Sequence, residues 1–309
     1  MKAEFVCPCL FPWSTPLYDR LTQLMEERPH LFRPYATIHA VFGCFANFKW
    51  NGGGKNMFGD MPTEEIIVQT LDFYGNKGID VYLTATNPCI EERDLHDRYA
   101  NMTMRLAEEK NDHVKVLVAS PILEAYLRET YPGLKIIKSI IASEHIVDYN
   151  AEIKNYEQMV LGRPFAFDID KMKTINEEDR GRYEILLNDE CNLDCPRLYS
   201  HYVVNGPVMM FISEPDETPG FHCTAPAASS QFAIELQRFH VISPQELEEI
   251  YMPMGYSKFK ISGRTANGRI LREMLPFIVK PEFQTEIYYD VIRYTDSHPV
   301  SVYVKDNVY

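Results

Sequence analysis

The residues best suited to chemistry follow directly on a short apolar run. Residues 185–187 are apolar and bounded by polar residues, which predicts a strand buried on both faces. Cys191 and Cys195 come next, with Arg197 and His201 close behind. Thiolate and imidazole groups bind soft metals, and guanidinium groups bind carboxylates. We therefore expect a metal centre or a catalytic site in this stretch.

The number of cysteines argues against a disulfide framework. The chain of 309 residues has seven, an odd number, and is too long to need disulfide bonds for stability. Each cysteine taken alone could equally be a small buried apolar residue. The cysteines lie at positions 7, 9, 44, 89, 191, 195 and 223. These positions relative to the predicted strands have to distinguish a buried apolar role from a metal-binding or catalytic one.

Composition narrows the class of protein. The net charge of −13 argues against a surface built to neutralise nucleic-acid phosphates. The sequence contains no apolar run long enough to cross a membrane. Its first residues lack the long apolar core and the small-residue cleavage site of a signal peptide. These observations predict a cytoplasmic protein.

Apolar runs alternate with helical patterns along most of the chain. Eight runs predict strands, at residues 4–7, 37–43, 79–85, 114–119, 134–140, 164–169, 183–187 and 257–261. Between them, apolar residues recur at helical spacing, as in Leu17, Leu21 and Leu24. This alternation predicts an α/β fold, a TIM-like (β/α)₈ barrel, with a doubly wound open sheet as the alternative.

The connection between the seventh and eighth predicted strands is the longest. We assign residues 192–256 to an insertion and residues 1–280 to the barrel that contains it. Residues 281–309 form a C-terminal extension, which we expect to pack on the barrel or to join a partner chain as a homo- or hetero-oligomer contact. No repeat or low-complexity linker divides the chain further.

A barrel of this kind would bring the cysteines together. Its active-site face is built by the loops that follow the strands, and each cysteine follows a predicted strand or lies in the insertion on the same face. The Cys-x₃-Cys spacing matches no common zinc signature, whereas a four-cysteine iron–sulfur cluster accepts ligands from separate loops. Zinc stays as an alternative, because His201 and His222 could supply nitrogen ligands.

Two segments carry a family resemblance. The motif NDECNLDCPRLYSHY, then Cys223, then ISPQELEEIYMPMGYSKFKISGR resemble the collagenase-like peptidase family, peptidase family U32. The resemblance implies a (β/α)₈ barrel. It also implies a 4Fe-4S cluster, as in relatives that hydroxylate ubiquinone precursors or RNA bases without oxygen. The implied ligands are Cys191, Cys195 and Cys223, with Cys89 or Cys44 as the fourth.

Cations would then surround the proposed cluster. Lys260 and Arg264, at the end of the eighth predicted strand, would join Arg197 in facing the same cavity. Arginine suits bidentate binding of a carboxylate, and lysine supplies a single charge. The expected substrate is a small anionic metabolite, and the expected catalytic residues are Arg197, His201, Lys260 and Arg264.

Three other functions remain open. A cysteine peptidase would pair Cys191 with His201, and a zinc hydrolase would need an open coordination position. A non-catalytic barrel that binds a small molecule or a protein could use aromatic residues of the rim as a lid or interface. Those residues are Phe45, Phe48 and Trp50.

Overall fold

Eight parallel strands close into a barrel in sequence order, and β8 pairs with β1. The computed structural model describes residues 2–8, 10–52, 61–188, 198–210, 241–263 and 267–300. The strands are β1 (Ala3–Pro8), β2 (Ala36–Gly43), β3 (Asp80–Ala85), β4 (Val114–Val118), β5 (Lys135–Lys138), β6 (Gln158–Val160), β7 (Tyr183–Leu186) and β8 (Lys258–Lys260). The predicted TIM-like (β/α)₈ barrel is therefore confirmed.

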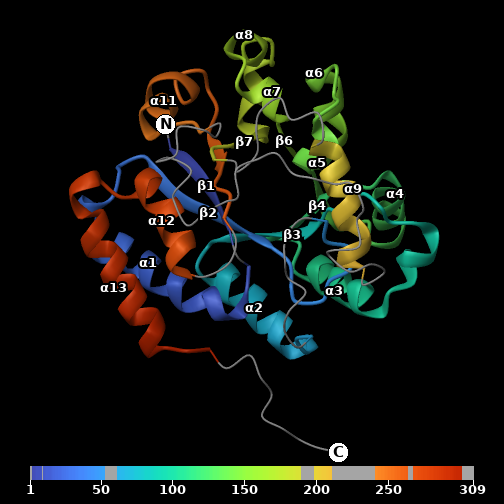
Figure 1. Ribbon diagram of the computed structural model, residues 1–309, viewed down its shortest axis with the longest axis horizontal. Coiled ribbons are helices and arrows are strands. Elements are labelled where there is room, and N and C mark those ends of the chain that lie inside the picture. The colour runs from blue at the N-terminus through green and yellow to red at the C-terminus, as the bar shows by residue number, and fades with distance from the viewer. Residues whose placement is uncertain are drawn as a thin grey trace, which may run out of the picture.

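Helices surround this barrel (Figure 1). They are α1 (Thr15–Glu27), α2 (Glu64–Asn76), α3 (Arg98–Glu109), α4 (Pro121–Thr130), α5 (Ile140–Ser143), α6 (Tyr149–Glu152), α7 (Arg163–Ala166), α8 (Ile169–Met172), α9 (Leu198–Met209), α11 (Pro244–Glu246), α12 (Asn267–Ile278) and α13 (Gln284–Ser297). Short 3₁₀ segments lie at Pro12–Ser14, Pro29–Leu31, Glu92–His96, Ile153–Asn155, Glu177–Arg182 and Pro281–Phe283, and a π-helical turn at Leu247–Tyr251.

Side chains alternate between two apolar cores, as strand geometry requires. The larger core lies between the strands and the helices, where Leu17, Leu21 and Leu24 bury the inner face of α1. The smaller core fills the inside of the barrel. It is formed by Val6, Ala40, Tyr82, Leu117, Ile137 and Val160.

Side-chain caps fix where several helices begin. The hydroxyl of Ser120 accepts from the Leu123 amide at the start of α4, as its position before a proline predicts. The sequence also suggests Asn87 as the cap of the helix that follows the third strand, which is wrong. Asp97 caps α3 by accepting from the Ala100 amide. Asn87 is buried elsewhere, at the end of the barrel.

The sixth predicted strand is misplaced. Residues 164–169 do not form a strand, because Pro164 lies in the first turn of the short helix α7 and opens it. The strand is β6, and Gln158 begins it. The apolar residues of 208–212 also suggest a short β-like segment inside the insertion, which is wrong at Val208. Val208 lies in α9, and residues 211 and 212 are outside the described part.

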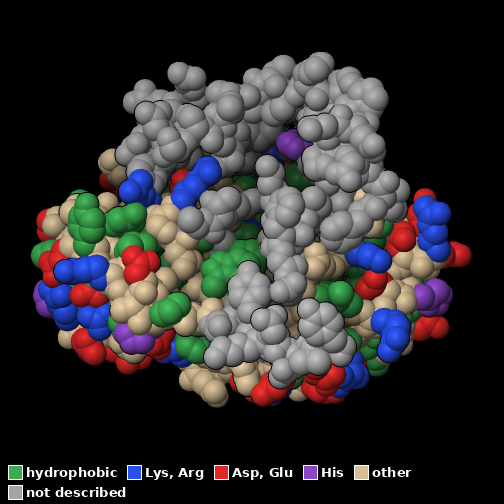
Figure 2. Space-filling model, turned by 60° about the horizontal axis from the view of Figure 1, so that its bottom comes forward, with side chains coloured by type: hydrophobic (Ala, Val, Ile, Leu, Met, Phe, Trp, Pro, Cys, Tyr) green, Lys and Arg blue, Asp and Glu red, His purple; other side chains and the backbone are tan. Residues whose placement is uncertain are grey.

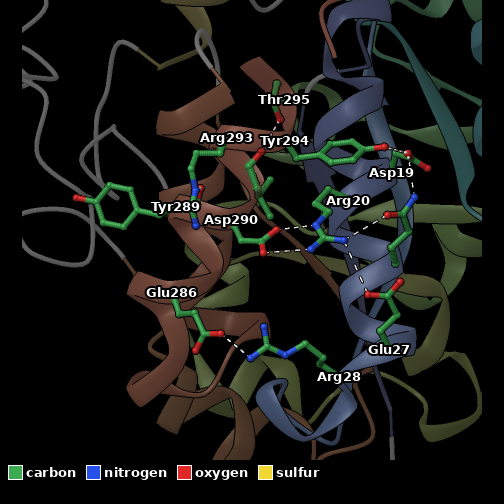
Figure 3. Close-up of polar contacts among 12 residues, drawn as sticks. Asp19, Arg20, Glu27, Arg28, Glu286, Tyr289, Asp290, Arg293, Tyr294 and Thr295 are labelled. Atoms are coloured by element: carbon green, nitrogen blue, oxygen red, sulfur yellow. Dashed lines mark hydrogen bonds and ion pairs between the residues drawn. The ribbon is translucent and has the colours of Figure 1, made fainter. Parts of the chain in front are cut away.

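The helix α13, which follows the barrel, lies along α1 (Figure 3). Arg20 on α1 forms a two-pronged contact with Asp290, with Nε 2.6 Å from Oδ1 and Nη2 3.1 Å from Oδ2. The hydroxyl of Tyr294 donates to Asp19 Oδ2 at 2.7 Å. These contacts hold α13 on the outside of the helix that follows β1.

The described surface carries charges of both signs. Figure 2 shows Lys and Arg side chains interspersed with Asp and Glu side chains over the described part of one face. Among the helices that the structure describes, none combines the length and the apolar character that a membrane span requires.

Candidate functional site

Asn188 fixes the point from which the chain leaves β7 towards Cys191. Its side-chain Nδ2 donates to the Ser262 carbonyl oxygen at 3.0 Å and to Glu273 Oε2 at 2.9 Å. Its Oδ1 accepts from the Ser262 amide at 2.6 Å. Asn188 is only 3% exposed, and Ser262 follows β8. The amide side chain therefore locks the carboxyl ends of β7 and β8 together and ties both to α12.

Shortly after the cysteine pair, the chain enters α9, which packs on the loop that follows β3. Asn87 Nδ2 donates to the Gly206 carbonyl oxygen of α9 and also to the Lys49 carbonyl oxygen, each at 3.1 Å. Asn87 Oδ1 accepts from the Cys89 amide at 3.0 Å. One buried amide side chain thus joins three segments at the carboxyl end of the barrel.

Cys89 makes a second contact with α9. Its Sγ lies 3.3 Å from the carbonyl oxygen of Val203. Pro207 has no N–H, so it cannot make the helical hydrogen bond to the residue four positions earlier, which is Val203. Burial, followed by the negative charge of Glu91, raises the pKa of Cys89, which keeps the thiol protonated. The thiol therefore donates to the carbonyl that Pro207 leaves open.

Further contacts join α9 to the loops after β5 and β6. Arg163, at the start of α7, donates from Nη2 to the hydroxyl of Tyr202 at 2.6 Å. The Arg163 guanidinium also lies 3.8 Å from a carboxylate oxygen of Glu144. The rings of Tyr199 and His145 meet edge to face. Helix α9 thus contacts loops that follow β3, β5 and β6, on the active-site face of such barrels.

A chain of polar side chains crosses the inside of the barrel below this face. His39 Nε2 lies 3.2 Å from the Tyr82 hydroxyl, which donates to Gln158 Oε1 at 3.1 Å. Gln158 Nε2 donates to Glu184 Oε2 at 2.8 Å, and Lys260 Nζ donates to Glu184 Oε1 at 3.0 Å. The chain links five strands, from β2 to β8.

The direction of this chain follows from its donors. Ionised Glu184 only accepts, so the amide of Gln158 turns its nitrogen to the carboxylate and its oxygen to Tyr82. Tyr82 donates to that oxygen, which leaves His39 as the donor to Tyr82. Burial, followed by the charge of Glu184, raises the pKa of Tyr82 well above its usual value. Along this series of hydrogen bonds, the donors therefore point towards Glu184 both from the His39 side and from the Lys260 side.

Lys260 lies inside the barrel. It is 8% exposed, and its Nζ lies 3.9 Å from the centre of the Phe42 ring, in a cation–π contact. Because its ammonium group is already paired with Glu184, it neutralises a buried carboxylate in this arrangement. His201 lies on α9, half-buried. The remaining predicted residues lie outside the described part, namely Arg197, Arg264, Cys191, Cys195, Cys223 and the alternative zinc ligand His222.

The described cysteines occupy different environments. Cys89 is partly exposed at the carboxyl end of the barrel. Cys44 directly follows β2 and is buried in the outer core, and Cys7 is buried within β1 with its side chain in the same core. The sequence suggested that Cys7 follows the first strand. This is wrong, because Cys7 lies inside β1. Within the described ranges, no group of three metal-binding side chains could hold an ion.

The aromatic residues expected at the rim are buried instead. Phe45, Phe48 and Trp50 are each at most 2% exposed, so they cannot form an exposed lid or interface. The Trp50 indole donates to the Asp94 carbonyl oxygen at 2.9 Å, and its ring meets Tyr126 edge to face. These residues belong to the larger, outer core, and Trp50 ties that core to the segment after β3.

Sequence reasoning missed Glu184, Gln158 and Tyr82. A signal for Glu184 was present, because a carboxylate stands beside a buried apolar run and Lys260 stands in the facing strand. A charged residue inside a strand that is otherwise apolar has to find a partner of opposite charge.

No protein-family model matches the chain, and no curated protein matches it. Two solved structures are similar to it. The U32 peptidase Mk0906 aligns over 86% of this chain and 95% of its own, with a TM-score of 0.49 and 13% sequence identity. The carboxyl transferase domain of Rhizobium etli pyruvate carboxylase, with 3-bromopyruvate, aligns over 95% and 47%, with a TM-score of 0.40 and 7% identity. The function must therefore be argued from the residues of this chain.

Proposed function

We propose that this chain is a U32-like barrel enzyme that holds a 4Fe-4S cluster at the carboxyl end of its barrel. Its substrate would be a small anionic metabolite, in redox or oxygen-independent hydroxylation chemistry. The observation that carries the proposal is the position of Cys89. Its partly exposed thiol contacts α9, and α9 begins just after the Cys191 and Cys195 stretch.

The described ends of the cysteine stretch support the same location. Asn188 is held between the ends of β7 and β8, and α9 is held on the loops after β3, β5 and β6. Both anchors belong to the face where barrel enzymes place their active sites. Cys191 and Cys195 lie between these anchors in the sequence.

Cys89 fits the fourth ligand better than Cys44 does. Cys89 is partly exposed on the active-site face, whereas Cys44 is 1% exposed in the apolar core. A metal-bound thiolate cannot donate, so ligation by Cys89 would exchange its hydrogen bond to Val203 for a bond to iron. Cys191, Cys195 and Cys223 would supply the other thiolates.

A bound cluster would supply one-electron chemistry next to the substrate. Lys260 is already paired with Glu184, so we no longer propose that it binds the substrate. Arg197 and Arg264 would bind the substrate carboxylate instead. Arginine binds a carboxylate through two parallel hydrogen bonds. His201, on α9, would serve as a proton donor or acceptor beside the substrate.

The test is metal and sulfide analysis on protein purified without oxygen. Iron and sulfide at about four per chain, with a broad visible absorption that air bleaches, would support the proposal. The content should fall in Cys191→Ser, Cys195→Ser and Cys223→Ser. Cys7→Ala is the matched control, because Cys7 lies in the outer core.

Two outcomes would overturn the cluster. Colourless protein with about one zinc per chain would point to the zinc hydrolase instead. Protein free of both metals, with all variants behaving alike, would leave a peptidase or a binding protein to be considered.

A further inference from the structure

Helix α9 has a sequence that favours a helix only weakly. Within its twelve residues it contains the β-branched Val203 and Val204, then Gly206 and Pro207. Glycine and proline are the poorest helix formers, and an isolated helix of this length is marginal even with good ones. Contacts with the barrel therefore have to supply much of the stability of α9.

Gly206 is the point of closest approach between α9 and the barrel. A Cβ atom at this position would lie 2.6 Å from Cys89 Sγ and 2.7 Å from Asn87 Oδ1. Both distances are shorter than non-bonded contacts allow. Glycine is therefore required here for the backbone of α9 to rest directly on the loop after β3.

Asn87 supplies the polar half of the same contact. It is fully buried, and its two donors bind the carbonyl oxygens of Gly206 and Lys49. Leaving such groups without partners in a buried site costs more free energy than a typical hydrogen bond contributes. The Cys89 thiol adds its bond to the Val203 carbonyl, one turn earlier in α9.

We infer that Asn87 and Gly206 are positioning residues that dock α9 on the loop of Cys89. This inference rests on the proposed function for its consequence: α9 follows the Cys191 and Cys195 stretch in the sequence, so a docked α9 fixes the residue at which that stretch ends. If Cys89 binds iron, its bond to Val203 is given up. The Asn87 contacts then hold the helix on the loop after β3, while Arg163 still binds Tyr202 on another side of α9.

The experiment is hydrogen exchange of the α9 amides, read by mass spectrometry on the full-length protein. Asn87→Asp keeps the shape of the side chain but replaces both donors by an acceptor, and Gly206→Ala adds the methyl group that has no room. Each should speed exchange in α9 by about tenfold, the effect of losing one to two kcal/mol of local stability. Exchange in β4 should not change.

Two variants act as controls. Gly181→Ala adds the same methyl group where the nearest atom, Ser257 Oγ, is 3.8 Å away, so α9 should stay protected. Cys89→Ser keeps a donor for the Val203 carbonyl and should also leave α9 protected. Equal protection of α9 in the native chain, Asn87→Asp and Gly206→Ala would overturn the docking.

Metal content of the same samples separates the two proposals. Positioning predicts that Asn87→Asp and Gly206→Ala lose iron and sulfide, whereas Gly181→Ala retains them. A higher metal content in the undocked variants would contradict positioning, because docking would then compete with the metal. If neither the native chain nor Gly181→Ala holds metal, the proposed function fails, and hydrogen exchange alone decides whether Asn87 and Gly206 dock α9.

Discussion

Glu184 on β7 and Lys260 on β8 form an ion pair inside the barrel, with 3.0 Å between Oε1 and Nζ. The carboxylate is fully buried, and Gln158 donates to its other oxygen. Removing two charges from water is costly, and in a buried pair each charge depends on the other. The interior of this barrel is therefore more sensitive to single changes than its apolar residues suggest.

Lys260→Met should destabilise the protein by about 3–5 kcal/mol, because it leaves a buried carboxylate without its cation. The double variant Glu184→Gln with Lys260→Met should cost less than the sum of the two single changes. The free energy of unfolding in urea measures both. Lys258→Met is the matched control, since Lys258 pairs with the partly exposed Glu4 on the same strand face and should cost about 1 kcal/mol. Strict additivity would contradict this account.

Stability should fall as the pH drops below the ordinary pKa of histidine, because burial and the charge of Lys258 lower the pKa of His39. The folded protein favours neutral His39 despite Glu4 and Asp80, whereas the unfolded chain takes up the proton near pH 6.5. Protons therefore bind preferentially to the unfolded chain in this window.

Urea unfolding between pH 5 and pH 8 tests this prediction. His39→Gln retains a donor for Tyr82 and should flatten the slope, while His30→Gln, at an exposed position, should leave it unchanged. The same slope in the native chain and in His39→Gln would assign the effect to other groups.

Asn188→Asp should destabilise the end of the barrel strongly. The new carboxylate would replace the donor that now faces the Glu273 carboxylate at 2.9 Å, so two negative charges would be buried together. We expect a loss of about 3–5 kcal/mol in the free energy of unfolding. Adding Glu273→Gln should recover most of it, because the second charge is removed. A double variant as unstable as Asn188→Asp would show that the repulsion is not the cause.

Asp290→Asn should loosen α13 from α1. The hydrogen bonds from Arg20 lower the pKa of Asp290 despite its partial burial, so the ionised form stabilises the fold. This stabilisation is present above the unfolded pKa of about 3.9 and is lost as the pH falls through the lower folded value. We expect a loss of about 1–2 kcal/mol at neutral pH.

Glu27→Gln provides the control for this contact, because Glu27 is an exposed partner of Arg20 at 3.8 Å and should cost less than about 0.5 kcal/mol. Thermal unfolding at neutral pH and at pH 3 compares the two variants. A similar loss of stability in Asp290→Asn and Glu27→Gln would contradict this account. It would mean that the two-pronged geometry of the Arg20–Asp290 pair (Figure 3) contributes no stability beyond that of a simple charge pair.

The sequence predicts the barrel well where its strands are apolar runs. β2, β3 and β4 follow runs of Val, Leu and Ile that stop at polar or turn residues. β6 fails because it has only three residues and one of them, Gln158, turns a polar side chain into the barrel. The following PFAFDI reads as a strand, but Pro164 suits the first turn of a helix equally well.

The site is less predictable because it depends on contacts between distant segments. Asn87 looks like a helix cap from its neighbours alone, and only the fold brings Gly206 to it. Pro207 gave a local signal, since it must leave the Val203 carbonyl open, but the sequence does not say that Cys89 fills that position. Phe48 and Trp50 read as rim residues because the loop around them is polar and rich in glycine.

Closure of the barrel by β8 against β1 has a consequence for synthesis on the ribosome. One edge of β1 and one edge of β7 stay unpaired until β8 is available. β8 leaves the ribosome only after the whole stretch that carries α9. Unpaired strand edges promote aggregation, and long-range pairing is slow. A nascent chain that stalls before Lys258 would therefore expose two unpaired strand edges at once. Binding of chaperones to the nascent chain should be strongest in that interval.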